Sequence, residues 1–236
     1  MRSYRDPFGN VVEVYNHRPP HRKVVVEARS VVETSPPAPA RESSINEGER
    51  YRLLRFDGPV IDSPALRALA AEVGAPGATA TPELLTDLAA LVHDRFVYEP
   101  NVTNVASTVE DLLTFGRGVC QDFAHLWLGL CRALGLPARY VSGYIWNGDS
   151  RPEQASHAWG EAWVPGQGWL AYDPTNYTPR SRGRAGEQHV RVAVGRDYRD
   201  VPPTRGVFRG AARETLSVEV RVTQLAAEEL TQALRA

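Results

Sequence analysis

The sequence predicts an α+β protein in which a group of helices precedes an antiparallel sheet. Between about residues 63 and 135, apolar residues recur every three or four positions, as in helices that bury one face. From 138 to 194, strand-like runs alternate with glycine turns. Because helices and strands are segregated rather than alternating, the pattern favours α+β over a parallel βαβ sheet.

The first 60 residues read as a separate β segment. Residues 11–15 and 23–33 are rich in β-branched side chains, and residues 8–10 form a turn signal between strands. These strands are too few to form a free-standing sheet. We therefore expect the segment to be part of a larger β-domain or to lean on the rest of the chain. A proline-rich loop at 35–40 and a polar, mobile stretch to Arg50 follow. The expected domains are therefore residues 1–60 and 61–236.

Three helix starts carry capping signals. Ser63-Pro64 and Thr81-Pro82 each place a cap before a proline at the first helical position, and the helices they begin extend to about residues 74 and 95. Residues 107–110 resemble a capping box before a short helix that ends near residue 115.

A glycine-rich turn and one further helix, at residues 116–137, organise the chain. Cys120 lies in the first helical turn, where unpaired backbone N–H groups and the helix dipole favour thiolate over thiol. The preceding glycines allow a sharp turn and close approach of a substrate. Cys120 also falls on the apolar stripe, so simple burial is the alternative. Cys131, in the middle of the helix, is expected to pack in the core and is too far from Cys120 for a disulfide.

Strands and polar loops are predicted after residue 137. The expected polar loops are residues 147–154 and 178–187, and a short terminal helix is expected at 226–234. The expected strands are residues 138–146, 156–164, 169–173, 189–194 and 215–222.

A base and its orienting group are predicted on two neighbouring strands. His157 starts the first strand and Asp173 ends the second, across a short glycine turn. A loop of two or four residues would place these side chains on opposite faces of the hairpin. For both to face Cys120, the hairpin needs an odd loop or a bulge, for which Gly166 and Gly168 supply the backbone freedom. Taken singly, His157 and Asp173 are equally compatible with structural roles.

Composition excludes several classes of function. The chain has 236 residues, of which 42% are hydrophobic and 23% charged, and a formal net charge of −1. This balance implies no general attraction to nucleic acid or to anionic membranes. Residues 1–6 do not form an apolar signal region, and no apolar run is long enough to cross a bilayer. Two cysteines that cannot pair fit a reducing compartment, so we expect a cytoplasmic location. No spacing typical of zinc or calcium ligands is found, and no cofactor is expected.

The sequence contains four further motifs, at residues 116–125, 132–144, 157–163 and 168–175. Together they resemble those of the transglutaminase-like superfamily of papain-fold enzymes. The bacterial branch of this family also carries a run similar to residues 189–198, followed by Val201-Pro202-Pro203 and Gly206. The resemblance covers about residues 84–224, and residues 1–60 are similar to the later half of the β-domain that precedes the core in that branch.

The resemblance implies a papain-like core and a catalytic triad of Cys120, His157 and Asp173, with the Cys120 N–H as one oxyanion donor. Animal transglutaminases use an upstream tryptophan as a second donor; residues 84–115 contain no equivalent, and Tyr98 is expected to pack. Asp122 is expected to stabilise the helix N-terminus or a neighbouring loop, and His125 to pack. Tryptophans at 146, 159, 163 and 169 are interpreted as walls of a cleft.

This chemistry forms an acyl-enzyme, and the acceptor that resolves it defines the activity. We expect a thiol peptidase or amidase that hydrolyses peptide or isopeptide bonds, with a peptide or protein amide as substrate. The alternatives are transamidation of protein glutamine, an acyltransferase related to arylamine N-acetyltransferases, and a non-catalytic binding scaffold.

Overall fold

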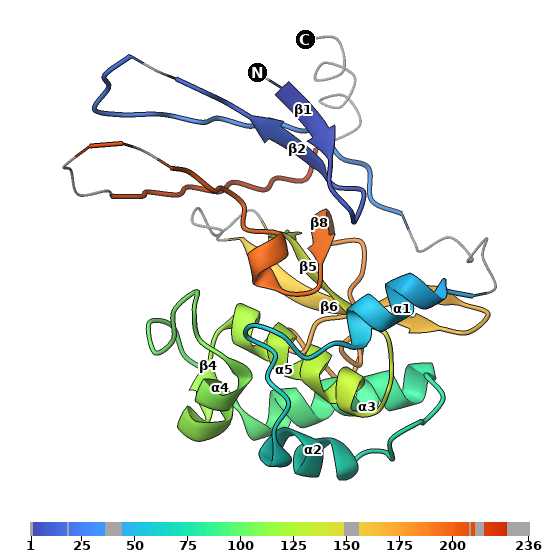
Figure 1. Cartoon of the computed structure of the whole chain (residues 1–236). Helices are drawn as coiled ribbons and strands as arrows, with labels where there is room; N and C mark the ends of the chain where they lie inside the picture. Colours follow the sequence, from blue (N-terminus) through green and yellow to red (C-terminus); the bar gives the residue numbers. More distant parts are fainter. Residues whose placement is uncertain are drawn as a thin grey trace.

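The computed structural model describes residues 2–17, 19–35, 44–148, 156–207, 209–210 and 215–225. Helices cover one side of a four-stranded antiparallel sheet, and an N-terminal hairpin lies on the other side (Figure 1). The predicted α+β class is confirmed. None of the helices in the described part of the chain combines the length and the hydropathy that crossing a bilayer requires.

The helices α2 (Pro64–Ala71), α3 (Pro82–Arg95) and α4 (Val109–Phe115) begin where capping signals were found. The side chains of Ser63 and Thr81 each accept a backbone N–H from the first turn that follows. In α4 the cap is Thr108, and Asp111 closes the capping box, one residue later than predicted.

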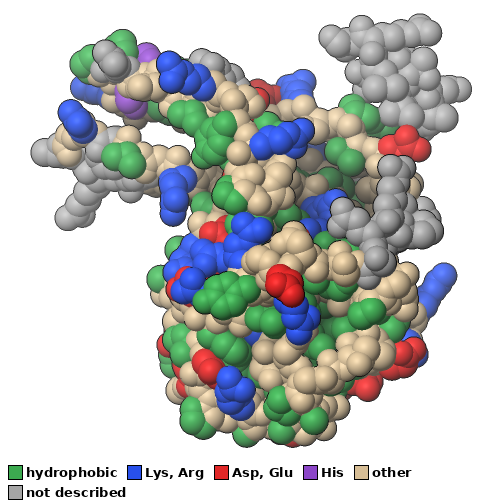
Figure 2. All heavy atoms as spheres, turned by 45° about the vertical axis from the view of Figure 1, so that its right-hand side comes forward, with side chains coloured by type: hydrophobic (Ala, Val, Ile, Leu, Met, Phe, Trp, Pro, Cys, Tyr) green, Lys and Arg blue, Asp and Glu red, His purple; other side chains and the backbone are tan. Residues whose placement is uncertain are grey.

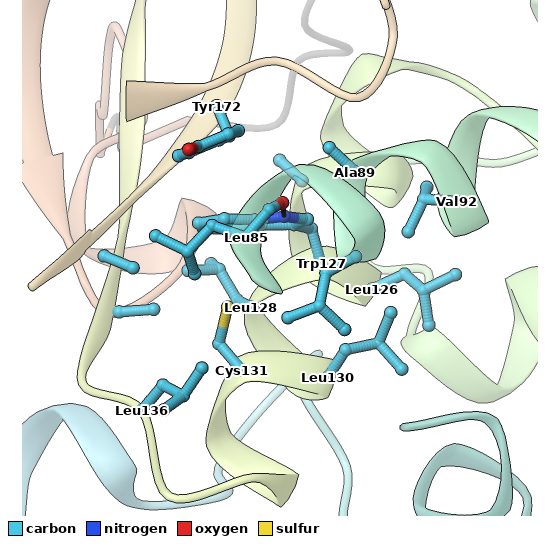
Figure 3. Close-up of a cluster of buried hydrophobic side chains, with 14 of the residues drawn as sticks. Leu85, Ala89, Val92, Leu126, Trp127, Leu128, Leu130, Cys131, Leu136 and Tyr172 are labelled. Carbon is cyan, nitrogen blue, oxygen red and sulfur yellow. Dashed lines mark hydrogen bonds between the residues drawn. The ribbon is translucent and has the colours of Figure 1, made fainter. Parts of the chain in front are cut away.

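Helix α5 (Cys120–Ala133) is the centre of the core. All of its residues are buried except the first two. Trp127 stacks on Tyr172 with ring centroids 5.7 Å apart, and its Nε1 donates to the Leu85 carbonyl at 3.4 Å (Figure 3). Cys131 lies in the same apolar cluster and is fully buried, so its predicted core position is confirmed.

The main sheet has the strand order β7-β6-β5-β8, with every neighbouring pair antiparallel. A β-bulge interrupts the pairing of β5 with β8 between Ser142 and Gly143. A short 3₁₀ turn at Tyr198–Asp200 follows the edge strand β8. The strands are β5 (Ala138–Ile145), β6 (His157–Val164), β7 (Gly168–Tyr172) and β8 (His189–Gly195).

The N-terminal hairpin of β1 (Arg2–Arg5) and β2 (Val11–Val14) contacts the sheet through its turn. The Asp6 carboxylate accepts the N–H groups of Phe8 and Asn10, which forms the predicted turn. The Asn10 amide then bonds both backbone groups of Val194, donating to the carbonyl at 2.7 Å and accepting the N–H at 2.9 Å. One side chain thus pairs with part of the free edge of β8, and the hairpin leans on the sheet as expected.

Two predicted strands are wrong. Residues 23–33 and 215–222 are not part of any regular strand, and the only strand-like assignment within these two described ranges is a bridge at Val220. Valines in both segments are exposed, and Figure 2 shows apolar side chains along the arms that project from the globular body. A β-branched run favours an extended backbone, but a strand forms only where a partner supplies the hydrogen bonds.

The prediction of a polar, mobile stretch that extends to Arg50 is also wrong, because this stretch contains part of a helix, α1 (Glu47–Leu54). Asn46 caps this helix by accepting the Glu49 N–H, and Leu53 is buried beneath it. Residues 36–43, most of the predicted loop at 147–154 and the predicted terminal helix at 226–234 lie outside the described residues.

The contact between β6 and α5 gives a prediction about stability. A Cβ added at Gly160 would lie 2.3 Å from the buried ring of Trp127. Because that ring has no room to move, we expect Gly160→Ala to lower the free energy of unfolding by about 1–3 kcal/mol. Denaturant unfolding checks this, with Gly206→Ala as control, since nothing lies within 4 Å of that position. Equal stability of the two variants would contradict the packing.

Candidate active site

Cys120 is half-buried at the first position of α5, and a buried carboxylate secures the turn before it. Asp122 Oδ2 accepts the Val119 N–H at 2.8 Å and the Thr103 hydroxyl at 2.6 Å. Burial raises the pKa of Asp122, and these two hydrogen bonds oppose that shift. Asp122 therefore stabilises the helix N-terminus and a neighbouring loop, as predicted.

The hairpin of β6 and β7 has the predicted irregularity. Val164 pairs with Gly168, which leaves a loop of three residues, 165–167, and both Gly166 and Gly168 have positive φ. Gly160 pairs with Tyr172, so position 173 continues opposite position 159. Residues directly opposite in an antiparallel pair share a face, and so do residues two apart in one strand. The odd loop therefore places His157 and Asp173 on the same face.

The structure brings the three predicted site residues together. His157 Nε2 lies 2.8 Å from Asp173 Oδ2, and both side chains are buried. Cys120 lies close enough to His157 that its side chain helps to raise the pKa of that imidazole. Because Nε2 faces Asp173, Nδ1 is the ring atom left for the sulfur. In space, the base therefore lies between the nucleophile and the orienting carboxylate.

The charges in this arrangement support one another. Burial alone would lower the pKa of His157, but hydrogen bonds to Asp173 and Cys120, reinforced by their charges, raise it to about 10. Burial alone would raise the pKa of Asp173, but hydrogen bonds from His157 and His189 hold it well below its usual range. An imidazolium at His157, stabilised by an ionised carboxylate, is the partner that a thiolate at Cys120 would need to form an ion pair.

Comparison with known proteins agrees with this geometry. The family model of the transglutaminase-like superfamily matches residues 67–174. An uncharacterised protein of Mycobacterium leprae is 38% identical over 240 residues, which cover 95% of this chain and 83% of that protein. This chain belongs to the transglutaminase-like superfamily.

Two further relatives of this transglutaminase-like chain carry functional names. A protein-glutamine gamma-glutamyltransferase of Pseudomonas aeruginosa is 35% identical over 205 residues, which cover 80% of this chain but 30% of that protein. The crystal structure of a candidate cysteine protease from Cytophaga hutchinsonii matches with a TM-score of 0.55 and 28% identity, over 66% of this chain and 50% of the other.

Two residues at the transglutaminase-like site were not singled out by sequence reasoning. Asn176 Nδ2 and His189 Nε2 lie 2.8 and 3.0 Å from Asp173 Oδ2. Asn176 comes three residues after Asp173, where Asp and Asn commonly form local turns, so its position could have been inferred. His189 starts the distant strand β8. The available signal was Gly143 in the middle of β5, because a lone glycine in a strand often marks a bulge.

The ligand atoms of His157, Asp173 and His189 lie within 4.8 Å of one another, a spacing that would also suit a metal ion. Their hydrogen bonds favour shared protons instead. His189 Nδ1 accepts the Gly186 N–H at 3.1 Å, so the ring proton belongs on Nε2, the atom that would have to bind a metal. The arrangement is therefore that of a hydrogen-bonded carboxylate.

The aromatic residues near the site have unequal roles. Trp159 is buried and stacks on His157 with ring centroids 5.9 Å apart, so it forms a wall of the site. Trp163 and Trp169 instead pack on each other beside the β6–β7 turn, at the other end of β6 from His157. Tyr98 packs edge-on against Phe123, as expected, and remains half-exposed.

His125 packs in the core, as predicted. Its ring centroid lies 5.0 Å from that of Tyr140, and its Nε2 accepts the Tyr198 N–H at 3.2 Å. Burial lowers the pKa of His125 to about 3, so the imidazole is neutral.

The charge arrangement predicts the effect of Asp173→Asn. The carboxylate that opposes burial would be lost, so the pKa of His157 should fall and the thiolate should lose its cationic neighbour. We expect alkylation of Cys120 by iodoacetamide at pH 6.5 to slow about 10-fold or more. Peptide mass mapping separates this signal from Cys131, whose buried thiol is an internal control. An unchanged alkylation rate in the folded variant would show that Asp173 does not support the ion pair.

Proposed function

We propose that this chain is a thiol hydrolase of peptide or isopeptide amides that acts through an acyl-enzyme. The observation that carries the proposal is the position of His157, between a thiol at a helix N-terminus and a buried ionised carboxylate. The name of the Cytophaga hutchinsonii protein, a candidate cysteine protease, supports the same class.

Each residue has one part in the proposed reaction. The Cys120 thiolate attacks the carbonyl carbon, and the Cys120 backbone N–H helps to stabilise the oxyanion. As the C–N bond breaks, His157 gives its proton to the leaving amine, and a thioester remains. Water then attacks the thioester while His157 accepts a proton, and loss of the carboxylic acid restores the thiolate and the imidazolium. Asp173 orients His157 and stabilises its charge throughout.

Transamidation is the second candidate, because the Pseudomonas aeruginosa relative is named a protein-glutamine gamma-glutamyltransferase. In that reaction an amine replaces water as the acceptor, and the first half of the mechanism is unchanged. The two activities differ only in which acceptor reaches the thioester.

Replacing the nucleophile tests the proposal. We expect Cys120→Ala to abolish turnover of a peptide library followed by mass spectrometry, and to change the unfolding free energy by less than about 0.5 kcal/mol, because Cys120 is only half-buried at the start of α5. When an alkyl amine is added, we expect the wild-type protein to release mainly free carboxylic acids, formed by attack of water on the thioester, and few amides formed with the added amine.

The matched control is Cys131→Ala. Because Cys131 is buried in the core, this variant should lose about 1 kcal/mol of stability and keep the activity. Turnover by a folded Cys120→Ala protein would refute the triad assignment. If the products are mainly amides formed with the added amine, the proposed function changes from hydrolysis to transamidation.

A further inference from the structure

The carboxylate of Asp173 binds two imidazoles through the same oxygen. Oδ2 lies 2.8 Å from His157 Nε2 and 3.0 Å from His189 Nε2, and Asn176 Nδ2 is a third donor at 2.8 Å. The other oxygen, Oδ1, accepts the backbone N–H groups of Thr175 and Asn176. The His189 side chain is 6% exposed, so its contact with Asp173 is shielded from water.

The β-bulge in β8 turns His189 onto this side of the sheet. From Tyr140 to Ser142, paired residue numbers on β5 and β8 add to 335, and from Gly143 onward they add to 334, for example 143 with 191 and 145 with 189. The skipped residue is Val192, which is exposed. Gly143 pairs with both His157 and Arg191, so His189, two residues from Arg191, shares the face of His157. Without the bulge, His189 would face the other way.

The hydrogen bonds of His189 fix its tautomer. The Gly186 N–H donates to Nδ1 at 3.1 Å, so Nδ1 must be unprotonated, and Nε2 carries the proton that it donates to Asp173. Protonation of Nδ1 would break the bond with Gly186. His189 is therefore a neutral donor, whereas His157, whose other ring nitrogen faces Cys120, can carry two protons.

The catalytic cycle requires Asp173 to stay ionised while the charge of His157 changes. Asp173 is 1% exposed, and a buried carboxylate without enough donors takes up a proton. When His157 has given its proton away, the positive partner of Asp173 is lost. Donors that never change their charge keep the carboxylate ionised at that stage.

We propose that His189 is a positioning residue for the reaction proposed above: as a neutral Nε2–H donor, it holds Asp173 ionised and oriented in every protonation state of His157. The proposal rests on the proposed function. The titratable groups that face Asp173 are His157 from β6 and His189 from β8, with Cys120 of α5 beyond His157. From α3, His93 bonds the carbonyl of the adjacent Pro174 at 3.1 Å. Trp159 contacts both imidazoles and shields them.

The test compares His189→Gln, which keeps a neutral donor, with His189→Met, which has none. The readout is the iodoacetamide alkylation rate of Cys120 against pH, measured on the full chain. We expect His189→Met to move the acid limb of the profile up by about one pH unit, the size of one hydrogen bond to a charged group, and so to slow alkylation about 10-fold at pH values on that limb. We expect His189→Gln to keep the wild-type profile. Val192→Ala, on the same strand and exposed, is the matched control.

The outcomes separate the two proposals. If wild-type Cys120 shows no accelerated alkylation below neutral pH, the proposed function fails irrespective of His189. If wild-type alkylation is accelerated and His189→Met leaves it unchanged, or moves the acid limb down, the role of His189 is refuted. If His189→Met does not fold, His189→Gln alone is sufficient: loss of the wild-type profile in folded His189→Gln protein overturns the proposal, because the titrating imidazole would then be what matters.

Discussion

One buried oxygen atom, Oδ2 of Asp173, connects the parts of this site. An ionised carboxylate that is 1% exposed is unfavourable unless donors and a positive partner surround it. Here the partner comes from β6, one neutral donor from the turn after β7, and another from β8. Because each donor must lie within hydrogen-bond distance of the same atom, this requirement constrains where three segments of the chain begin or end. The raised pKa of His157 depends on that arrangement.

Two irregularities of one residue each place the side chains around that oxygen. Side chains alternate between the faces of a strand, so a shift of one residue reverses every side chain beyond it. The three-residue loop between β6 and β7 sets His157 and Asp173 on one face, and the bulge at Gly143 brings His189 to the same face. At Gly143, a Cβ would lie 2.2 Å from the Val190 carbonyl oxygen and 2.6 Å from the Trp159 ring, so glycine is what permits the close approach of the strands. The sheet therefore brings its functional side chains together by departing from regular pairing.

The sequence predicted the helices and the meeting of His157 with Asp173 because those features leave local signals. Caps at Ser63 and Thr81 precede helices directly, and the odd hairpin loop follows from requiring two side chains on one face. The role of His189 left only an indirect signal, the glycine at 143, because it depends on a bulge in a strand and on a backbone N–H three residues away. The strands predicted at residues 23–33 and 215–222 are wrong for the opposite reason. Their composition favours strands, but a strand needs a partner, and composition does not reveal that partner. Features that depend on neighbouring residues could thus be predicted from the sequence, whereas the pairing of distant segments could not.

The protonation state of His157 in the resting protein tests the central claim most directly. Ring ¹⁵N chemical shifts of His157, followed by NMR as a function of pH, report whether one or both ring nitrogens carry a proton. The thiolate–imidazolium pair predicts that both nitrogens are protonated at pH 7, with the transition near the pKa of about 10. A neutral ring at pH 7, with a transition near the ordinary histidine value of about 6.5, would contradict the ion pair.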